Sequence, residues 1–444
     1  MKSQIQNIGM AMIVAGSLAL FNASAFGQLS MPVGSFKDSP VPVGTSNSDV
    51  VLPHFRDGRL WVSGQTNFIF RTHPGFKAKY SGPNSLVSNY EKATSRVMTL
   101  YTGLPVNSST EVVVHIEEAG GNGLSTALGL AGFSNLDVVR NPTLSSAPYL
   151  ARGMVHKVFA LSSEQAEAER GPLSTFSELP VRRLELRAGK FGTADFFDVN
   201  SVGSDSHLQF MNWSTAQNGA YDYSADTRGY TWGVLAEYQG RTWALRFSES
   251  LMPTVANGLN MEWSLRKAHS ENVEYELRRG LLPKKQGAVR LLNFVNHANM
   301  GVYKDAVEAY LSGQTTKPDI TAHPWKTTAK YGFGINVEQC LTHNLTAYPR
   351  YGWNDGKTES LLTPRSIALF REVSVRPVLN GIARRTARVS LFPPMQFLTP
   401  TRIILPREGW ASSLATVRCG TAGRISSKLI TRRISGDGYL WRPM

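Results

Sequence analysis

The residue types that carry chemistry in enzymes are sparse in this sequence and fall in no catalytic spacing. Its nine histidines include no HExxH pair, its two cysteines, Cys340 and Cys419, make no disulfide framework or metal site, and no GxSxG nucleophile motif occurs. The run from Gly120 to Gly123 lacks the Lys-Ser/Thr ending of a phosphate-binding loop and predicts a turn. We therefore expect no enzyme activity, no cofactor and no metal.

The basic charge of the chain is concentrated at its C-terminal end. The net charge is +14, from 47 Lys and Arg against 33 Asp and Glu. Residues 361–444 hold 14 Lys and Arg and three acids, a net of +11, which leaves 33 basic and 30 acidic residues, a net of +3, for residues 1–360. This distribution predicts no nucleic-acid partner, because the basicity does not spread over the folded part. The Arg-rich tail needs its own explanation.

The first residues have the composition of a secretory signal peptide. Lys2 precedes an apolar run from Ile8 to Phe21, and Ala23-Ser24-Ala25 provides a small-residue cleavage site, so residues 1–25 are predicted to be removed on export. No later stretch has the roughly 18 apolar residues that a membrane helix needs. If the chain crosses a membrane, it must do so as a closed β-barrel, the other fold that satisfies every backbone polar group in lipid.

Apolar and polar residues alternate between Leu60 and Trp353, in runs that end at Gly, Asn, Asp or Pro. In residues 330–338, Tyr331, Phe333, Ile335 and Val337 share one face, and Lys330, Asn336 and Glu338 share the other with two glycines. Similar runs occur at 62–71, 112–117, 230–239, 243–248 and 272–277. A period of two predicts antiparallel β-strands. The segment Ser162 to Arg170 interrupts the pattern and predicts a short helix or loop at one rim.

Alternation alone fits either a secreted β-sandwich or a transmembrane barrel. The runs are long, their apolar faces are aromatic, and their polar faces carry both signs of charge, which favours a barrel with a wet lumen. In that fold Glu274, Glu276, Lys330 and Glu338 face the lumen, while Tyr275, Tyr331, Phe333 and Val337 face lipid.

A series of motifs runs in order from Trp61 to Ser360. It includes Gly64-Gln65-Thr66, His73-Pro74-Gly75-Phe76, Tyr80-Ser81-Gly82-Pro83-Asn84, Gly129-Leu130-Ala131-Gly132-Phe133, Gly189-Lys190-Phe191, Asp195-Phe196-Phe197-Asp198-Val199-Asn200, Phe210-Met211-Asn212-Trp213, Arg228-Gly229-Tyr230 and Gly352-Trp353-Asn354-Asp355-Gly356-Lys357. With these motifs the chain resembles the carbohydrate-selective porin family (OprB type). The resemblance implies an all-β fold, a transmembrane antiparallel β-barrel of about 16 strands in the bacterial outer membrane, which admits sugars by diffusion.

Sugar permeation needs a narrow polar passage whose acids, basic groups and aromatic faces bind the solute weakly enough for it to leave. Strand parity and motif position give the candidate pore-lining residues Arg71, Lys190, Asp195, Asp198, Asn200, Trp213, Asp222, Arg228, Glu237 and Arg246. For each of them the alternative role is an ion pair in the barrel wall or a residue that shapes a loop.

The family pattern ends abruptly after Ser360. Read from the third base of each possible codon, residues 360–370 can encode Phe-Ala-Tyr-Thr-Glu-Ile-Asp-Arg-Thr-Phe, and residues 400–409 can encode His-Gln-Asp-Tyr-Leu-Ala-Ala-Gly-Gly. Residues 413–431 can encode a stretch that ends in Ile-Ile-Glu-Ala-Tyr-Tyr. All three are family-type sequences in family order, so we infer that residues 361–433 are a frame-shifted translation. The closing strands are then expected to be disrupted.

The sequence thus predicts a signal peptide (1–25), an N-terminal periplasmic or plug segment (26–58), a porin β-barrel (59–360) and an aberrant Arg-rich tail (361–444). The expected function is an outer-membrane porin for carbohydrates and similar small polar solutes. Its partners would be these solutes and outer-membrane lipid. The sequence leaves open whether the protein forms a homo-oligomer. The alternative from another class is a secreted, soluble carbohydrate-binding β-protein.

Overall fold

The computed structural model describes residues 60–360, apart from 80, 83–84, 128, 137–143, 145, 323–325 and 343–344, together with the backbone of four short strands between 370 and 432. The predicted signal peptide, the segment 26–58 and most of the tail lie outside the described residues.

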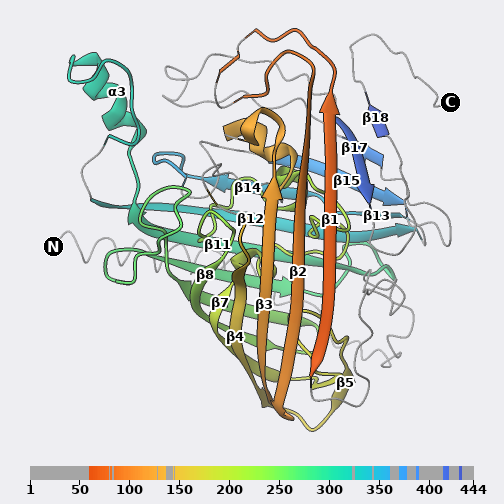
Figure 1. Ribbon diagram of the computed structural model, residues 1–444. Helices are drawn as coiled ribbons and strands as arrows, with labels where there is room; N and C mark the ends of the chain where they lie inside the picture. The colour runs from red at the N-terminus through yellow and green to blue at the C-terminus, as the bar shows by residue number, and fades with distance from the viewer. Residues whose placement is uncertain are drawn as a thin grey trace. The chain divides into compact units, whose positions relative to one another are not determined.

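One antiparallel sheet contains every strand of the described chain except β5 and β6 (Figure 1). Its main strands are β1 (Trp61–His73), β2 (Glu91–Asn107), β3 (Thr110–Gly121), β4 (Tyr149–Ala160), β7 (Arg183–Phe191), β8 (Thr231–Gln239), β9 (Trp243–Ser250), β10 (His269–Leu277), β11 (Gly287–Asn299), β12 (Thr327–Thr342), β13 (Leu345–Ala347) and β14 (Arg350–Asn354). From β1 to β12 each strand pairs with the next one in this list, and β12 pairs with both β13 and β14. The fold class predicted from the sequence is confirmed.

The connections between these strands alternate between short and long. The short ones include residues 108–109 between β2 and β3 and residues 240–242 between β8 and β9. The long ones carry the helical turns η2 (Leu124–Ala127), η3 (Gly129–Ser134), η4 (Thr193–Asp195), α2 (Trp213–Ala216) and α3 (Tyr303–Leu311). Short turns at one end and long loops at the other are typical of outer-membrane barrels. Among the described residues, no helix has the length and apolar character to cross a membrane.

The segment that interrupts the alternation is a hairpin. β5 (Gln165–Glu167) pairs with β6 (Glu178–Pro180) in a separate two-stranded sheet between β4 and β7. The expectation of a short helix or loop for Ser162 to Arg170 is therefore wrong in part. The local Ala/Glu composition favours a helix, but pairing with a segment ten or more residues away supplies the backbone hydrogen bonds instead.

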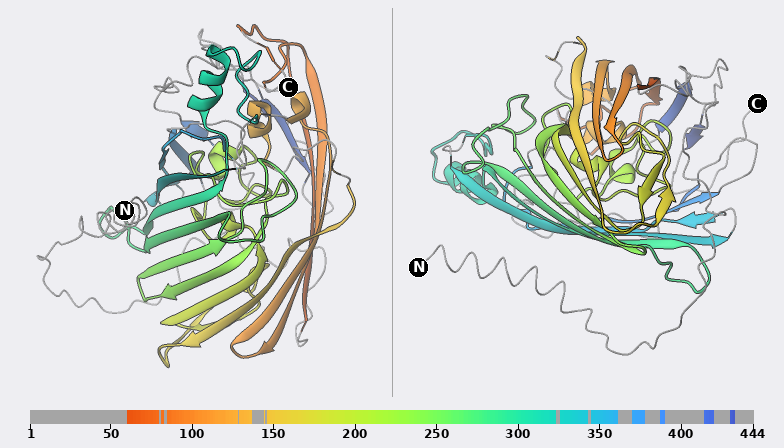
Figure 2. Two further views of the ribbon diagram at one scale, coloured as in Figure 1. Left: turned by 90° about the vertical axis from the view of Figure 1, so that its left-hand side faces the viewer. Right: turned by 90° about the horizontal axis from the view of Figure 1, so that it is seen from below.

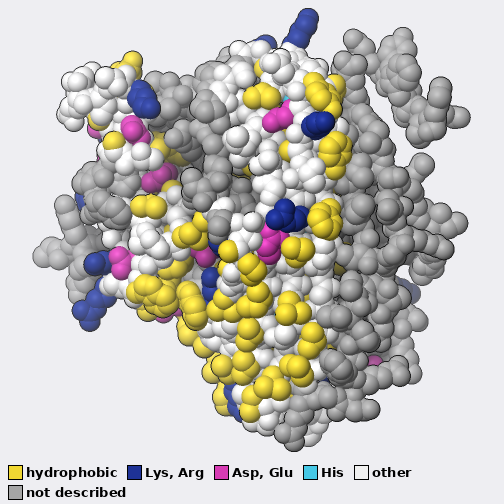
Figure 3. Space-filling view, in the orientation of Figure 1, with side chains coloured by type: hydrophobic (Ala, Val, Ile, Leu, Met, Phe, Trp, Pro, Cys, Tyr) yellow, Lys and Arg dark blue, Asp and Glu magenta, His cyan; other side chains and the backbone are white. Residues whose placement is uncertain are grey.

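The two faces of the sheet differ in polarity as the period of two predicts. On β8 and β9, Val234, Leu245 and Phe247 are exposed on one face, while Glu237 and Ser248 are buried on the other. Figure 3 shows apolar side chains gathered over the lower part of one outer face. The long loop of residues 192–230 lies on the opposite, concave face (Figure 2). We call that concave face the inner face.

The predicted facing of the charged residues is confirmed. Glu274, Glu276 and Lys330 are buried on the inner face, and Glu338 contacts the loop 192–230 there. Their strand neighbours Tyr275, Tyr331, Phe333 and Val337 have the opposite parity and are only partly buried.

The sheet ends in short strands on both sides. β15 (Phe370–Pro377) pairs with β13 and β14, and β16 (Ala387–Val389) pairs with β15. At the other end β17 (Leu414–Cys419) pairs with β1, and β18 (Ile430–Arg432) pairs with β17. Among the described strands no pairing joins the two ends, so the ring is not closed. This agrees with the expected disruption of the closing strands.

A charged residue placed on the outer face of the sheet tests whether that face contacts lipid. In a chain whose reading frame is restored after Ser360, Leu245→Arg, in the middle of the outer face of β9, is expected to destabilise the folded state in lipid vesicles by about 2–4 kcal/mol, because a cation at mid-bilayer is poorly solvated. Equilibrium unfolding in urea, read as heat-modifiable migration on a detergent gel, measures the loss. Leu245→Ala is the matched control with a smaller cost. Equal stability of the Arg and Ala variants would contradict lipid exposure of this face.

A corrected reading frame tests the account of the tail. A chain whose frame is restored after the Ser360 codon is expected to fold into vesicles and conduct. The chain as written is expected to insert poorly, because unpaired strand edges in lipid leave backbone groups without partners. The folded fraction and the channel frequency in planar bilayers measure the difference. Stable, fully closed pores from the chain as written would refute the structural consequence of the frame shift.

Candidate functional site

A row of paired charges crosses the inner face of the sheet. At its centre Arg246 on β9 donates from Nε to Glu237 (2.6 Å), from Nη1 to Glu274 (2.8 Å) and from Nη2 to Glu276 (2.5 Å). The strand register explains this arrangement, because Glu237 on β8 and Glu274 on β10 are the direct cross-strand partners of Arg246. Three carboxylates therefore surround one guanidinium.

The row extends to both sides of Arg246. Towards β7, Arg187 bonds Glu185 at 2.5 Å and lies 3.6 Å from Glu237. Towards β12, Arg290 lies 3.3 Å from Glu276 and 3.4 Å from Glu338. We call the whole row the charge belt; its members are Arg183, Glu185, Arg187, Glu237, Arg246, Glu274, Glu276, Arg278, Arg290 and Glu338. It holds five arginines and five glutamates, so its formal net charge is zero.

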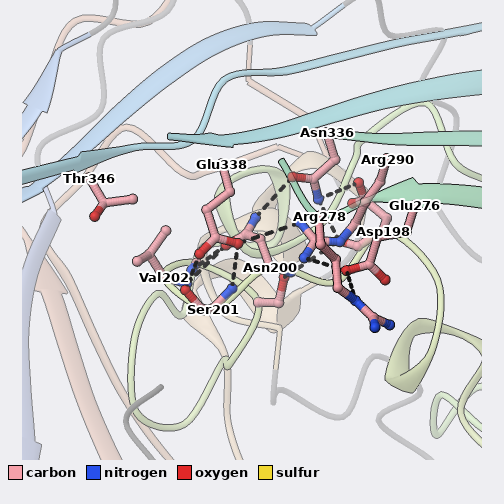
Figure 4. A network of polar contacts seen from close by, with 12 residues as sticks. Asp198, Asn200, Ser201, Val202, Glu276, Arg278, Arg290, Asn336, Glu338 and Thr346 are labelled. Carbon is pink, nitrogen blue, oxygen red and sulfur yellow. Dashed lines mark hydrogen bonds and ion pairs between the residues drawn. The ribbon is translucent and has the colours of Figure 1, made fainter. Parts of the chain in front are cut away.

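The loop of residues 192–230 is anchored to this side of the sheet through Asp198 (Figure 4). The backbone N–H of Asp198 donates to Glu274 (2.7 Å), and its carbonyl accepts from Asn336 and Arg350 (both 2.9 Å). Its carboxylate accepts from Asn336 and from the N–H of Asn218 (2.7 Å). Asp198 has φ 59°, a left-handed conformation that Asp tolerates better than most residues. Its contacts offset the strain.

A second anchor lies near the end of the same loop. Lys330 on β12 and Asp222 form an ion pair at 3.3 Å, and both side chains are buried. Ser360 donates to the Asp222 carboxylate, and Asn296 donates to the Asp222 carbonyl. The loop therefore contacts β11, β12 and the segment after β14 at this point.

Glycines on the inner face let the loop approach the strands closely. A Cβ atom at Gly352 would lie 2.1 Å from Asn218 Oδ1, and one at Gly334 would lie 2.6 Å from Asn218 Nδ2. The Asn218 amide bonds the Tyr351 carbonyl and the N–H of Ala220, so it is held in place. Gly334 on β12 and Gly352 on β14 thus make room for the loop.

A separate cluster joins the loop to β3, β4 and β7. Arg152 makes two hydrogen bonds to Asp195 (2.7 and 2.6 Å), and Lys190 lies 3.6 Å from Asp226. The Arg228 guanidinium lies 3.7 Å from the centre of the Tyr149 ring. Burial raises the pKa of the Asp226 carboxyl, and the charges of Lys190 and Arg228 oppose that rise. This cluster combines an aromatic face with charged groups.

The structure places the predicted site residues in four settings. Glu237 and Arg246 belong to the charge belt. Asp198, Asn200, Trp213 and Asp222 are buried in the anchored loop, and Lys190, Asp195 and Arg228 belong to the cluster near β4. Arg71 is buried on β1, where it donates to Ser134.

Two of these loop residues have local structural contacts. The Asn200 side chain accepts hydrogen bonds from the N–H groups of Val202 and Gly203. The Trp213 ring packs against the Phe133 ring, with their centroids 5.3 Å apart. Sequence reasoning missed Arg187, Arg290 and Glu185 as members of the belt. Their inward parity, together with the strand register, would have shown them.

No group of His, Cys, Asp or Glu within the described part of the chain has an arrangement that would hold a metal ion. The outward apolar face, the inward charge belt and the loop folded against it define the wall of a transmembrane β-barrel channel. A family model of the carbohydrate-selective porins, OprB family, matches residues 93–366. The chain belongs to that family, and its barrel is one of the bacterial outer membrane.

Solved structures with the same kind of fold are distant. OprB of Pseudomonas putida, solved at high pH, shares 13% identity over 71% of this chain and 70% of its own, with a TM-score of 0.46. Salmonella typhi OmpF in complex with daunomycin shares 10% over 73% of this chain and 88% of its own, with a TM-score of 0.31. Among curated proteins no relative matches the chain. The assignment therefore rests on the family model.

A methyl group at Gly352 tests the close approach of the loop. Gly352→Ala places a Cβ against the held Asn218 amide, so it is expected to destabilise the full-length chain folded in detergent by about 1–3 kcal/mol, as overpacking does. Urea unfolding measures the change. Gly64→Ala is the control, because its Cβ would meet only the Thr99 carbonyl at 3.9 Å. An equal effect of the two substitutions would contradict the packing of Asn218 on this strand.

Proposed function

We propose that this porin passes neutral carbohydrates and similar small polar solutes by diffusion along the inner face. The observation that carries the proposal is the charge belt, in which each arginine is paired with a glutamate and the formal charges cancel. A passage with net charge favours ions of the opposite sign. A balanced row instead offers fixed hydrogen-bond donors and acceptors, which suit the hydroxyl groups of sugars.

The outer surface supports a membrane location over the soluble alternative. Val155, Leu186, Val234, Leu245 and Phe247 are each at least 40% exposed, and they lie on strands β4, β7, β8 and β9, which are adjacent in the sheet. Soluble monomers rarely expose contiguous apolar patches larger than a few hundred Å². A lipid environment removes that cost, whereas a soluble carbohydrate-binding protein would need a partner on this face.

Sugar flux is the direct test of the proposed function. The full-length chain with its frame restored after Ser360, in vesicles, is expected to admit neutral monosaccharides faster than sugar acids of similar size, and osmotic swelling measures the rates. The chain as written serves as the comparison for closure. Equal exclusion of all sugars by a protein that is folded in the vesicles would refute the proposal.

The belt predicts a specific change of ion selectivity. In the frame-restored chain, Arg246→Ala removes the guanidinium that, among the described residues, contacts Glu237, Glu274 and Glu276 together. The passage then gains net negative charge and should favour cations severalfold more. The reversal potential in a salt gradient measures this shift. Arg241→Ala is the control, because the ion pair of Arg241 with Glu164 is exposed on a turn. An unchanged reversal potential in Arg246→Ala would place the belt outside the passage.

A further inference from the structure

The connection between β4 and β7 contains a turn that folds inward. It lies at the short-turn end of the strands, where β2 and β3 are joined by two residues alone. The N–H of Ala168 bonds the Ser177 carbonyl (2.8 Å), and Gly171 pairs with Ser174. We call residues 169–176 the inward turn. The β5 strand that precedes it is exposed, whereas Thr175 and Phe176 are buried.

The inward turn is fixed by one buried carboxylate. Glu111 on β3 is fully buried and accepts from Ser174 Oγ (2.8 Å), the Thr175 N–H (2.7 Å) and Thr175 Oγ1 (2.5 Å). His156 Nδ1 lies 2.7 Å from the same carboxylate. Glu111 has inward parity on its strand, as its neighbour Val112 faces the other way. The turn therefore sits on the inner face.

Packing confirms how closely the turn is seated. A Cβ atom at Gly103 on β2 would lie 2.3 Å from the Thr175 methyl group, so only glycine leaves room there. Phe176 contacts the His156 ring edge-on, with centroids 5.7 Å apart. Leu173 packs against the apolar cluster that also holds Trp213 and Tyr221 of the loop 192–230. The turn thus packs on the same apolar cluster as that loop.

Polar contacts also connect the turn with the charge belt. His156 bridges Glu111 and Glu185, with Nε2 2.9 Å from Glu185. Glu185 in turn bonds Arg187, which lies beside Glu237. A mere connection between two neighbouring strands needs none of these contacts, since two residues suffice between β2 and β3. Within this connection β5 is exposed, whereas residues 173–176 pack on the inner face.

We propose that the inward turn is a second constriction of the passage, at the short-turn end, and that Glu111 is the positioning residue that holds it. This inference rests on the proposed function as a porin. The turn and the loop 192–230 then restrict a solute one after the other. The polar groups of Ser174 and Thr175 are already bonded to Glu111. The second constriction therefore restricts solutes by their size.

Two variants test the seating and the constriction separately. Thr175→Val removes one donor to Glu111 and keeps the shape of the side chain. In the second variant Asn-Gly replaces residues 169–176, which closes a two-residue hairpin between Ala168 and Ser177. Arg241→Ala, near the exposed base of the segment, is the control. Because the hairpin variant leaves the wall strands intact, heat-modifiable migration is expected to be unchanged in all three.

Limited trypsin digestion of the full-length chain in detergent measures how firmly the inward turn is held on the inner face. This measurement does not need a conducting pore. Cleavage after Arg170 is expected to be slow in the parent chain and Arg241→Ala, and roughly tenfold faster in Thr175→Val, because proteolysis follows the population of the open turn. Cleavage after Arg170 as fast as after the exposed Arg182 in the parent chain would overturn the seating.

Recordings of the frame-restored chain in planar bilayers measure whether the inward turn narrows the passage. The Asn-Gly variant is expected to raise single-channel conductance about twofold and to admit larger oligosaccharides, since conduction follows the narrowest section. Unchanged conductance and size limit would overturn the constriction even if the turn is seated. Failure of the parent and of every variant to conduct, with Arg170 still protected, would refute the porin function and leave the seating as a purely structural contact.

Discussion

The constraint on which this structure depends is that one face of each strand lies in lipid. Charged side chains are then restricted to the inner face, where each of them needs a partner, since an unpaired buried charge is strongly destabilising. Antiparallel register meets this need by bringing Arg246 between Glu237 and Glu274. A shift of β9 by one residue would turn Arg246 into lipid and leave both carboxylates without it. The charge belt and the register therefore fix each other.

The same charges hold the loop on the inner face. Glu274 accepts from Arg246 and also from the backbone N–H of Asp198, and Glu338 contacts both Arg290 and Ser201. The belt and the loop are thus one polar network rather than a wall with a separate insert. Glycines at 334 and 352 complete the fit, because any side chain there would collide with Asn218. The position of the loop is set by the wall.

The sequence predicts the wall far better than the loops. A period of two places Glu274, Glu276 and Lys330 inward, and it also finds Arg246 and Glu237. The period of two does not predict the roles of Asp198 or Trp213. Both lie in a loop, where side chains do not alternate between two faces and where roles depend on contacts with distant strands. It also gives no hint of the hairpin at β5, whose stability comes from pairing with β6. Local pattern determines strands, and long-range contacts determine the loops.

The structure departs from a closed barrel at the two edges of the sheet. β1 pairs with β2 over its whole length from Trp61 to His73, but with β17 only from Phe68 to Thr72. Among the described strands, the pairing of β1 with β17 does not extend to the residues before Phe68. The family model ends at residue 366, close to the point where the inferred frame shift begins. The charge belt and both anchors of the loop 192–230 are formed by residues up to Ser360, before the inferred frame shift.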